Sequence, residues 1–176
     1  MTKFIATWFY IGLLPKMPGT WGAIAALPFA FVMLWLGFGW IDLLIVTALV
    51  FGAGVWAIGR ETVGVKDPDR PIYVIDEVAG MWIALLPIFW LNSSGMSFAT
   101  TLESGSQWAG IYPLQISVAL GLFRFFDVFK PWPLTLIQQR PTALGVMIDD
   151  FLAGVVTAAT LFAMNFALFY LGLSIS

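Results

Sequence analysis

Long apolar runs, separated by short polar or Gly- and Pro-containing segments, dominate the chain. Five runs have the length and composition of helices: residues 23–36, 43–59, 78–91, 111–129 and 154–173. Gly37 and Gly39 separate the first two, which predicts a helical hairpin with Asp42 near its tip. The run at 78–91 contains Pro87 and, at ~20 residues per span, crosses a membrane only if 73–77 joins it. The pattern predicts about four to five apolar helices, some of them re-entrant or interfacial.

Composition indicates the solvent in which these helices lie. Hydrophobic residues make up 60% of the 176-residue chain and charged residues 10%, whereas roughly a quarter of the residues in soluble domains are charged. We therefore expect an all-α integral membrane bundle formed by a single domain, residues 1–176. The apolar segment 4–14 lacks a signal-type cleavage motif and is expected to be a retained interfacial segment. The polar stretch 92–110 is expected to be a solvent loop.

The distribution of charge supports one orientation of the bundle. If the N-terminus lies in the cytoplasm, alternation of the segments puts all eight basic residues on the cytoplasmic side: Lys3, Lys16, Arg60, Lys66, Arg70, Arg124, Lys130 and Arg140. The other side receives only Asp42 and Glu103. The positive-inside rule expects this asymmetry. The same alternation brings three acidic segments, far apart in sequence, to one membrane interface.

Missing residue types limit the chemistry. The chain has no Cys, which excludes thiol catalysis and thiolate metal sites, and no His, which is the commonest general base. Its net charge of −2 argues against nucleic acid as a partner, because nucleic-acid binding requires a basic face. Any catalysis must therefore rely on carboxylates, amines, hydroxyls and metal.

Five acids lie in apolar surroundings, in the segments YVIDEVAG (73–80), FRFFDVFKP (123–131) and GVMIDDFLAG (145–154): Asp76, Glu77, Asp127, Asp149 and Asp150. Each costs several kcal/mol there unless a cation or a metal compensates its charge. Oxygen ligands from several segments suit a hard cation such as Mg²⁺. The simpler alternative is that these acids mark helix N-termini, where the dipole favours negative charge. Each adjacent acid pair has a glycine nearby, Gly80 or Gly154, which would allow close helix approach.

A second charged pattern lies near the end of the fourth run. Arg124, Asp127 and Lys130 recur at three-residue spacing, so the first two share a helix face. The pattern fits a metal ligand flanked by phosphate-binding cations. The simpler alternative, which is less favoured, is an intrahelical ion pair with Lys130 extending to the interface.

The turn that precedes the first run is rich in Gly and Pro. Its sequence, GLLPKMPGTWG (12–22), places Lys16 and Thr20 at a helix start and predicts a phosphate cradle, although P-loop spacing is missing. Another turn, Asp67-Pro68-Asp69, is interpreted as solvated rather than as a phosphoaspartate nucleophile.

At these same residues the chain resembles the phosphatidylglycerophosphatase A family of bacterial lipid phosphatases. The matching blocks agree in order and spacing from Gly12 to Gly154: GLLPKMPGTWG (12–22), IDEVAGMW (75–82), FRFFDVFKPWP (123–133) and GVMIDDFLAG (145–154).

The resemblance implies Mg²⁺-dependent hydrolysis of phosphatidylglycerophosphate to phosphatidylglycerol and inorganic phosphate at the bacterial cytoplasmic (inner) membrane. It implies a phospholipid substrate, and no obligatory protein partner is evident. It also agrees with the site expected from the residues. The expected metal ligands are Asp76, Glu77, Asp127, Asp149 and Asp150, of which all but Asp149 are also expected to be catalytic. The expected phosphate contacts are Lys16, Thr20, Arg124 and Lys130.

Alternatives to this mechanism and function follow from the same residues. Without His or Cys, attack by a water positioned by Asp76 or Glu77 is favoured, while an acyl-phosphate on an Asp and attack by Thr20 stay open. A small cation transporter or channel is the alternative of a different class, and it predicts acids near mid-membrane that are open to both sides. A phosphatidyltransferase ranks lower because its Asp-Gly-x-x-Ala-Arg signature is absent.

Overall fold

The computed structural model describes residues 1–65, 68–94, 107–129 and 142–170, and every regular element in these ranges is helical. The elements are α1 (Thr2–Ala6), the 3₁₀ turn η1 (Ile11–Leu13), α2 (Pro18–Trp35), α3 (Trp40–Glu61), α4 (Ile75–Ala84), α5 (Leu86–Ser93), α6 (Gln107–Phe129) and α7 (Ala143–Tyr170). Four segments of the described part are long and apolar enough to cross a membrane: Pro18–Trp35, Trp40–Glu61, Ile75–Ser93 and Ala143–Leu168. The predicted all-α bundle is confirmed.

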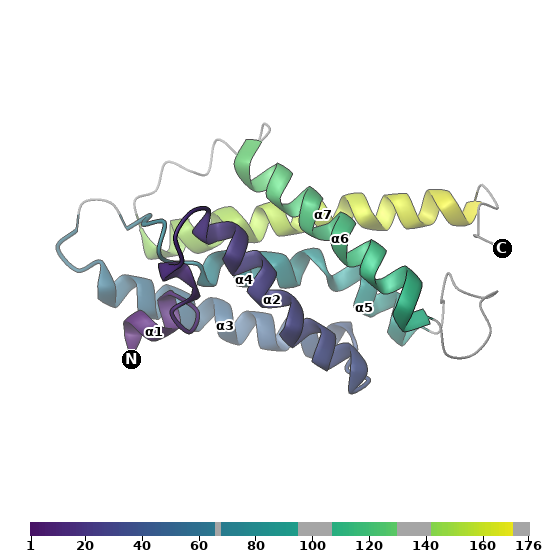
Figure 1. The fold of residues 1–176 in the computed structure, drawn as a ribbon, viewed down its shortest axis with the longest axis horizontal. Helices are drawn as coiled ribbons and strands as arrows, with labels where there is room; N and C mark the ends of the chain where they lie inside the picture. The colour runs from purple at the N-terminus through teal and green to yellow at the C-terminus, as the bar shows by residue number, and fades with distance from the viewer. Residues whose placement is uncertain (66–67, 95–106, 130–141, 171–176) are drawn as a thin grey trace.

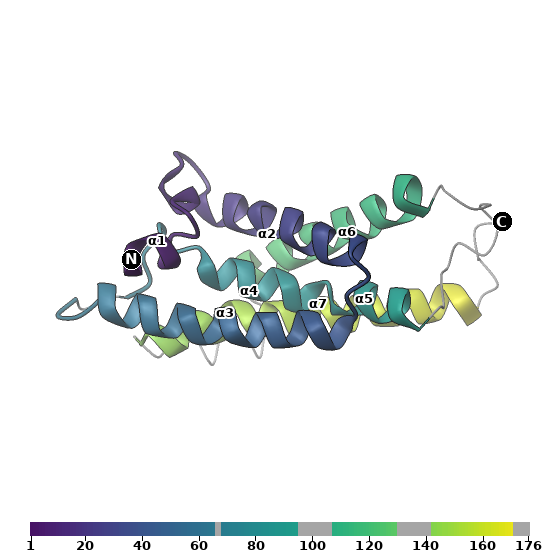
Figure 2. The same cartoon turned by 90° about the horizontal axis from the view of Figure 1, so that it is seen from below.

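Helix α4 forms the centre of the bundle. It contacts α2, α3, α6 and α7, which surround it (Figures 1 and 2). In the segment Ile75–Ser93, 78% of the residues are buried, against 28% in each of the other three candidate spans. Its small residues allow close packing: a Cβ on Gly154 of α7 would lie 2.3 Å from the Gly80 carbonyl oxygen of α4. The predicted close approach at these two glycines is confirmed. The indole Nε1 of Trp82 donates a hydrogen bond of 2.9 Å to the Ala26 carbonyl oxygen, which ties α4 to α2.

The short apolar run at 78–91 is divided into two helices. Helix α4 ends at Ala84, and α5 begins at Leu86 with Pro87 in its first turn, where the missing N–H of proline costs nothing. Together α4 and α5 form a segment of 19 residues that is long enough to cross a membrane. This length is reached because α4 starts at Ile75, before the apolar run begins at residue 78.

Two boundaries differ from those expected. Helix α7 begins at Ala143 instead of near residue 154, so the second acid pair lies inside the helix. The predicted solvent loop at 92–110 is helical at both ends, in α5 up to Ser93 and in α6 from Gln107, and its residues 95–106 lie outside the described part. At the start of α7 the polar residues interrupt the apolar pattern without interrupting the helix.

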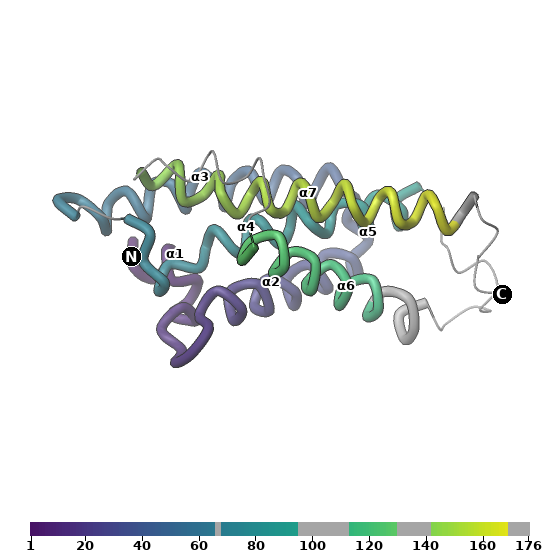
Figure 3. The backbone as a smooth tube through the Cα atoms, turned by 90° about the horizontal axis from the view of Figure 1, so that it is seen from above, coloured from purple at the N-terminus to yellow at the C-terminus, as the bar shows by residue number. Residues whose placement is uncertain are grey.

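The predicted hairpin joins α2 and α3. Gly37 adopts a positive φ of 82°, which glycine accommodates without strain, and the Gly39 N–H donates to Asp42 Oδ2 at 2.8 Å. Helices α2, α4 and α7 begin, and α3 and α6 end, near the end of the bundle that carries the N-terminus (Figure 3). The chain connectivity therefore collects the acidic segments at one end.

Candidate active site

Three carboxylates from two helices converge at the N-terminal end of the bundle. One oxygen from each of Asp76, Glu77 and Asp150 lies within 4.8 Å of the others. Asp76 and Asp150 are each only 6% exposed. Asp76 and Glu77 occupy the first turn of α4, as a helix-dipole role would require. Asp150 instead lies about two turns inside the 28-residue helix α7, so the dipole does not explain the cluster.

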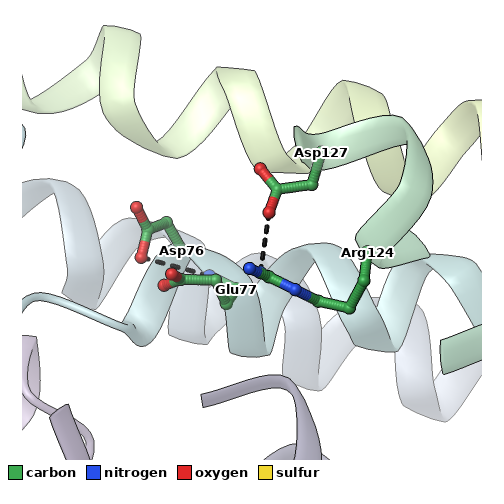
Figure 4. Close-up of polar contacts among 4 residues, drawn as sticks. All are labelled: Asp76, Glu77, Arg124 and Asp127. Carbon is green, nitrogen blue, oxygen red and sulfur yellow. Dashed lines mark hydrogen bonds and ion pairs between the residues drawn. The ribbon is translucent and has the colours of Figure 1, made fainter. Parts of the chain in front are cut away.

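Arg124 and Asp127 lie beside this cluster on α6 (Figure 4). Arg124 Nη1 is 2.6 Å from Asp127 Oδ2, which confirms the intrahelical ion pair. The same Nη1 is buried and makes no hydrogen bond of acceptable geometry within the described residues, so its N–H groups do not point at that oxygen. The two opposite charges therefore lie close together, while the N–H donors of Nη1 remain available to another acceptor.

The N-terminal turn of α2 closes one side of the acid cluster. A Cβ on Gly19 would lie 2.3 Å from Glu77 Oε1 and 3.1 Å from Arg124 Nη1, so at this approach of α2 any larger residue would have to displace the ends of these side chains. The adjacent Thr20 Oγ1 is buried and has no hydrogen-bond partner among the described residues. The predicted helix start thus reaches the site. Lys16, by contrast, is exposed and does not line the cavity described next.

A polar cavity of about 270 Å³ opens over the cluster. Six of its lining residues are acids: Asp69, Asp76, Glu77, Asp127, Asp149 and Asp150. All five predicted ligand acids therefore meet at one cavity. A larger groove of about 610 Å³ between α5 and α7 has no charged side chain in its lining and offers no contact for a phosphate.

The connection between α3 and α4 also lines this cavity. Its residues Asp69, Arg70 and Tyr73 were not predicted as part of the site. The sequence signal that could have found them is their position just before Asp76. Residues that directly precede the first turn of a helix lie at the same end of that helix as the side chains of that turn. Desolvation is the main cause that raises the pKa of the Tyr73 phenol. Lys130 lies outside the described residues.

The donor set fits a hard divalent cation. Three carboxylates this close repel one another unless a cation lies between them. Glu77 Oε2 is buried and has no hydrogen-bond partner within the described ranges, which leaves it available as a ligand. Oxygen donors alone, with neither His nor Cys in the chain, favour Mg²⁺ over zinc or copper.

Comparison with known proteins shows the family to which the chain belongs. The model of the family described as Phosphatidylglycerophosphatase A matches residues 4–165. The chain is similar to Phosphatidylglycerophosphatase A of Escherichia coli (strain K12), at 30% identity over 90% of this chain and 80% of the relative. It is also similar to Phosphatidylglycerophosphatase A of Haemophilus influenzae, at 32% identity over 92% of this chain and 87% of the relative.

A third relative carries a different description. It is a Bacteroides thetaiotaomicron protein described as a candidate phosphatidylinositol-3-phosphatase, at 31% identity over 86% of this chain and 85% of the relative. No solved structure matches the chain. The family match covers most of the chain, including the three acidic segments and the turn before α2. The chain therefore belongs to the phosphatidylglycerophosphatase A family.

Proposed function

We propose that this protein is a Mg²⁺-dependent lipid phosphomonoesterase. It hydrolyses phosphatidylglycerophosphate to phosphatidylglycerol and inorganic phosphate, at the cytoplasmic interface of the bacterial inner membrane, in phospholipid biosynthesis. The observation that carries the proposal is the convergence of Asp76, Glu77 and Asp150 within 4.8 Å at one end of a membrane bundle. The names of the three relatives, which describe phosphatases of phosphatidyl lipids, support the same substrate class.

The acid cluster would hold the metal. Asp76, Glu77 and Asp150 supply the ligands, with Asp127 and Asp149 on the same cavity wall. When bound, the ion neutralises phosphate charge and lowers the pKa of coordinated water. Each acid is bordered by apolar residues, which supports a cluster at headgroup depth, where a phosphate can reach it while acyl chains stay in lipid.

The side chains have separate tasks in hydrolysis. A carboxylate that is not saturated by metal, Asp76 or Glu77, accepts a proton from the attacking water as the water oxygen bonds to phosphorus. The bond from phosphorus to the glycerol oxygen breaks, and that oxygen takes up a proton. Arg124, with buried N–H groups that lack a hydrogen-bond acceptor among the described residues, balances the charge of the acids and donates to phosphate oxygens. Asp127 holds Arg124 in place.

Thr20 distinguishes the possible nucleophiles. Its buried hydroxyl lies in the first turn of α2, beside the glycine that contacts Glu77. Direct attack by water predicts that Thr20→Ala keeps measurable turnover, because the hydroxyl then only binds the phosphate. Complete loss of turnover in a folded Thr20→Ala protein would favour attack by the hydroxyl.

The positions of the acids favour hydrolysis over cation transport. A transport path needs ionisable groups accessible from both sides of the membrane. Here the described acids that line the cavity come from the first turn of α4, the final turns of α6, the early turns of α7 and the connection before α4. They therefore gather at one end of the bundle.

The distribution of basic residues supports a cytoplasmic orientation of the site. The described basic residues Lys3, Lys16, Arg60, Arg70 and Arg124 all belong to elements at the same end as the acids, which the positive-inside rule assigns to the cytoplasm. The chain has no Cys, so single cysteines can be labelled without background. In intact cells, a membrane-impermeant maleimide should label Leu36→Cys at once and Val63→Cys only after permeabilisation. The reverse pattern would overturn the orientation.

Inorganic phosphate release tests the function itself. Purified protein in detergent is given phosphatidylglycerophosphate with Mg²⁺, then with excess chelator, then with Mg²⁺ restored. We expect release that stops with chelator and returns with Mg²⁺. No release from folded protein, in any of these conditions, would contradict the proposal.

A further inference from the structure

The rim of the active-site cavity is a fixed turn between α3 and α4. The Arg70 N–H donates to the Pro68 carbonyl oxygen at 3.0 Å, and the Tyr73 N–H donates to the Arg70 carbonyl oxygen at 2.9 Å. The next residue, Val74, donates its N–H to the Ala6 carbonyl oxygen at 3.0 Å, which ties the turn to the N-terminal segment. Tyr73 itself is only 4% exposed and anchors the turn. The position of the rim is therefore set by the fold.

Arg70 is the cation that this turn presents to the cavity. It lines the cavity and is exposed. No carboxylate of the described residues lies within ion-pair distance of its guanidinium, whereas Arg124 is paired with Asp127. Arg70 is the one arginine that lines the cavity in the described part of the chain. Because its guanidinium is exposed and makes no ion pair with the described residues, it can donate hydrogen bonds to an anion that enters the cavity.

The depth of Arg70 indicates which anion this is. The proposed metal-binding acids Asp76 and Asp150 are buried, so the phosphate to be hydrolysed must enter the cavity. Phosphatidylglycerophosphate has a second phosphate, the phosphodiester that joins its glycerol to diacylglycerol. With the terminal phosphate at the acids, this phosphodiester is one glycerol away and lies towards the exposed rim.

We infer that Arg70 binds the phosphodiester of the lipid substrate and thereby gives the enzyme a preference for lipids that carry two phosphates over phosphatidic acid, which carries one. The inference rests on the proposed function and adds to it a residue that selects the substrate. A guanidinium suits the role because it can donate two parallel hydrogen bonds to one phosphate.

Comparison of two substrates tests this role. Phosphate release by wild type, Arg70→Gln and Arg70→Lys is measured with phosphatidylglycerophosphate and with phosphatidic acid in the same zwitterionic mixed micelles. For Arg70→Gln we expect kcat/KM on phosphatidylglycerophosphate to fall about 10- to 100-fold, the value of a charge-assisted hydrogen bond. The value on phosphatidic acid should not change. Arg70→Lys, which keeps the charge and loses the planar fork, should lie between the two.

Arg60→Gln is the matched control. Arg60 is exposed in the last turn of α3, at the same end of the bundle, but it does not line the cavity. The control removes one surface charge and should leave both kcat/KM values unchanged. Equal losses for Arg70→Gln and Arg60→Gln would reduce the effect to general attraction of anionic lipid and overturn the inference.

Product inhibition gives a second readout that does not depend on turnover of phosphatidic acid. Phosphatidylglycerol keeps the phosphodiester, and inorganic phosphate does not contain it. Arg70→Gln should weaken inhibition by phosphatidylglycerol about 10- to 100-fold and leave inhibition by inorganic phosphate unchanged. A loss of equal size for both inhibitors, or for both substrates, would place Arg70 on the terminal phosphate and contradict the inference. A wild type that releases no phosphate from any lipid would instead overturn the proposed function.

Discussion

Replacing Gly19 with Ala tests whether the position of Glu77 controls activity. A Cβ at Gly19 would lie 2.3 Å from Glu77 Oε1 and 3.1 Å from Arg124 Nη1, whereas ordinary contacts begin at 3.4 Å. The Glu77 oxygen must therefore move by about 1 Å to admit the methyl group. Both atoms belong to the ends of flexible side chains, so the backbone of α2 can stay in place.

The expected effect falls on turnover rather than on folding. Misplacement of a catalytic group by about 1 Å can cost roughly 100-fold in rate, and we expect a loss of that size in kcat/KM for phosphate release. Stability should change by less than about 1 kcal/mol, because alanine is a better helix former than glycine. Phosphate release and thermal unfolding in detergent, measured on the same preparation, separate the two quantities.

Two other glycines are matched controls for this experiment. Gly52 in α3 has nothing within 4 Å of an added Cβ, so Gly52→Ala should keep full activity. Gly154→Ala places its methyl group 2.3 Å from the Gly80 carbonyl oxygen, and because this is backbone the protein should unfold at a lower temperature. A folded Gly19→Ala protein with wild-type kcat/KM would refute the argument that contact between α2 and Glu77 matters for catalysis.

Four further substitutions distinguish the site from the scaffold. Asp127→Asn and Asp150→Asn should each abolish phosphate release while the circular dichroism spectrum and elution volume stay those of wild type; substantial activity in both would undo the site assignment. Asn165→Leu removes the 3.2 Å hydrogen bond from Gln115 Nε2 to Asn165 Oδ1 between α6 and α7, and thermal melts should show a loss of about 0.6 kcal/mol with activity unchanged. Asp42→Ala removes the carboxylate that accepts the Gly39 N–H at the opposite end of the bundle, which should cost about 0.5–1 kcal/mol and leave kcat unchanged. Loss of activity in either scaffold variant would mean that the site is coupled to distant packing.

Local signals in the sequence were sufficient for several parts of the fold. Gly37 and Asp42 mark the hairpin because a positive φ and a helix start each require particular residues nearby. Gly80 and Gly154 indicate the crossing of α4 and α7, since only a missing side chain permits that separation. The meeting of the acids at one end of the bundle was predicted from alternation of the segments across a membrane.

Burial could not be predicted from hydrophobicity. In a membrane, lipid-facing and core-facing side chains are equally apolar, so the sequence of α4 does not show that it lies at the centre while α2 and α3 face outward. The beginning of α7 was placed too late because Asp149 and Asp150 interrupt an apolar pattern but not a helix.

Sequence reasoning about the phosphate contacts was less complete. Arg70 has the features of an ordinary solvated turn residue, and only the packing of its turn against the N-terminal segment brings it to the cavity. Lys16 looks similar in sequence but is exposed away from the cavity lining. Its role in phosphate binding stays a prediction, as does that of Lys130.

Metal binding at the three carboxylates is the most direct test of the account. Mn²⁺, which is visible by electron paramagnetic resonance and shares the oxygen preference of Mg²⁺, is titrated into wild type, Asp76→Asn, Glu77→Gln and Asp150→Asn. We predict saturable binding in wild type, competition by Mg²⁺, and weaker binding in each variant together with loss of phosphate release. Equal binding in all four proteins, or full phosphate release from wild type after removal of divalent cations, would contradict the account.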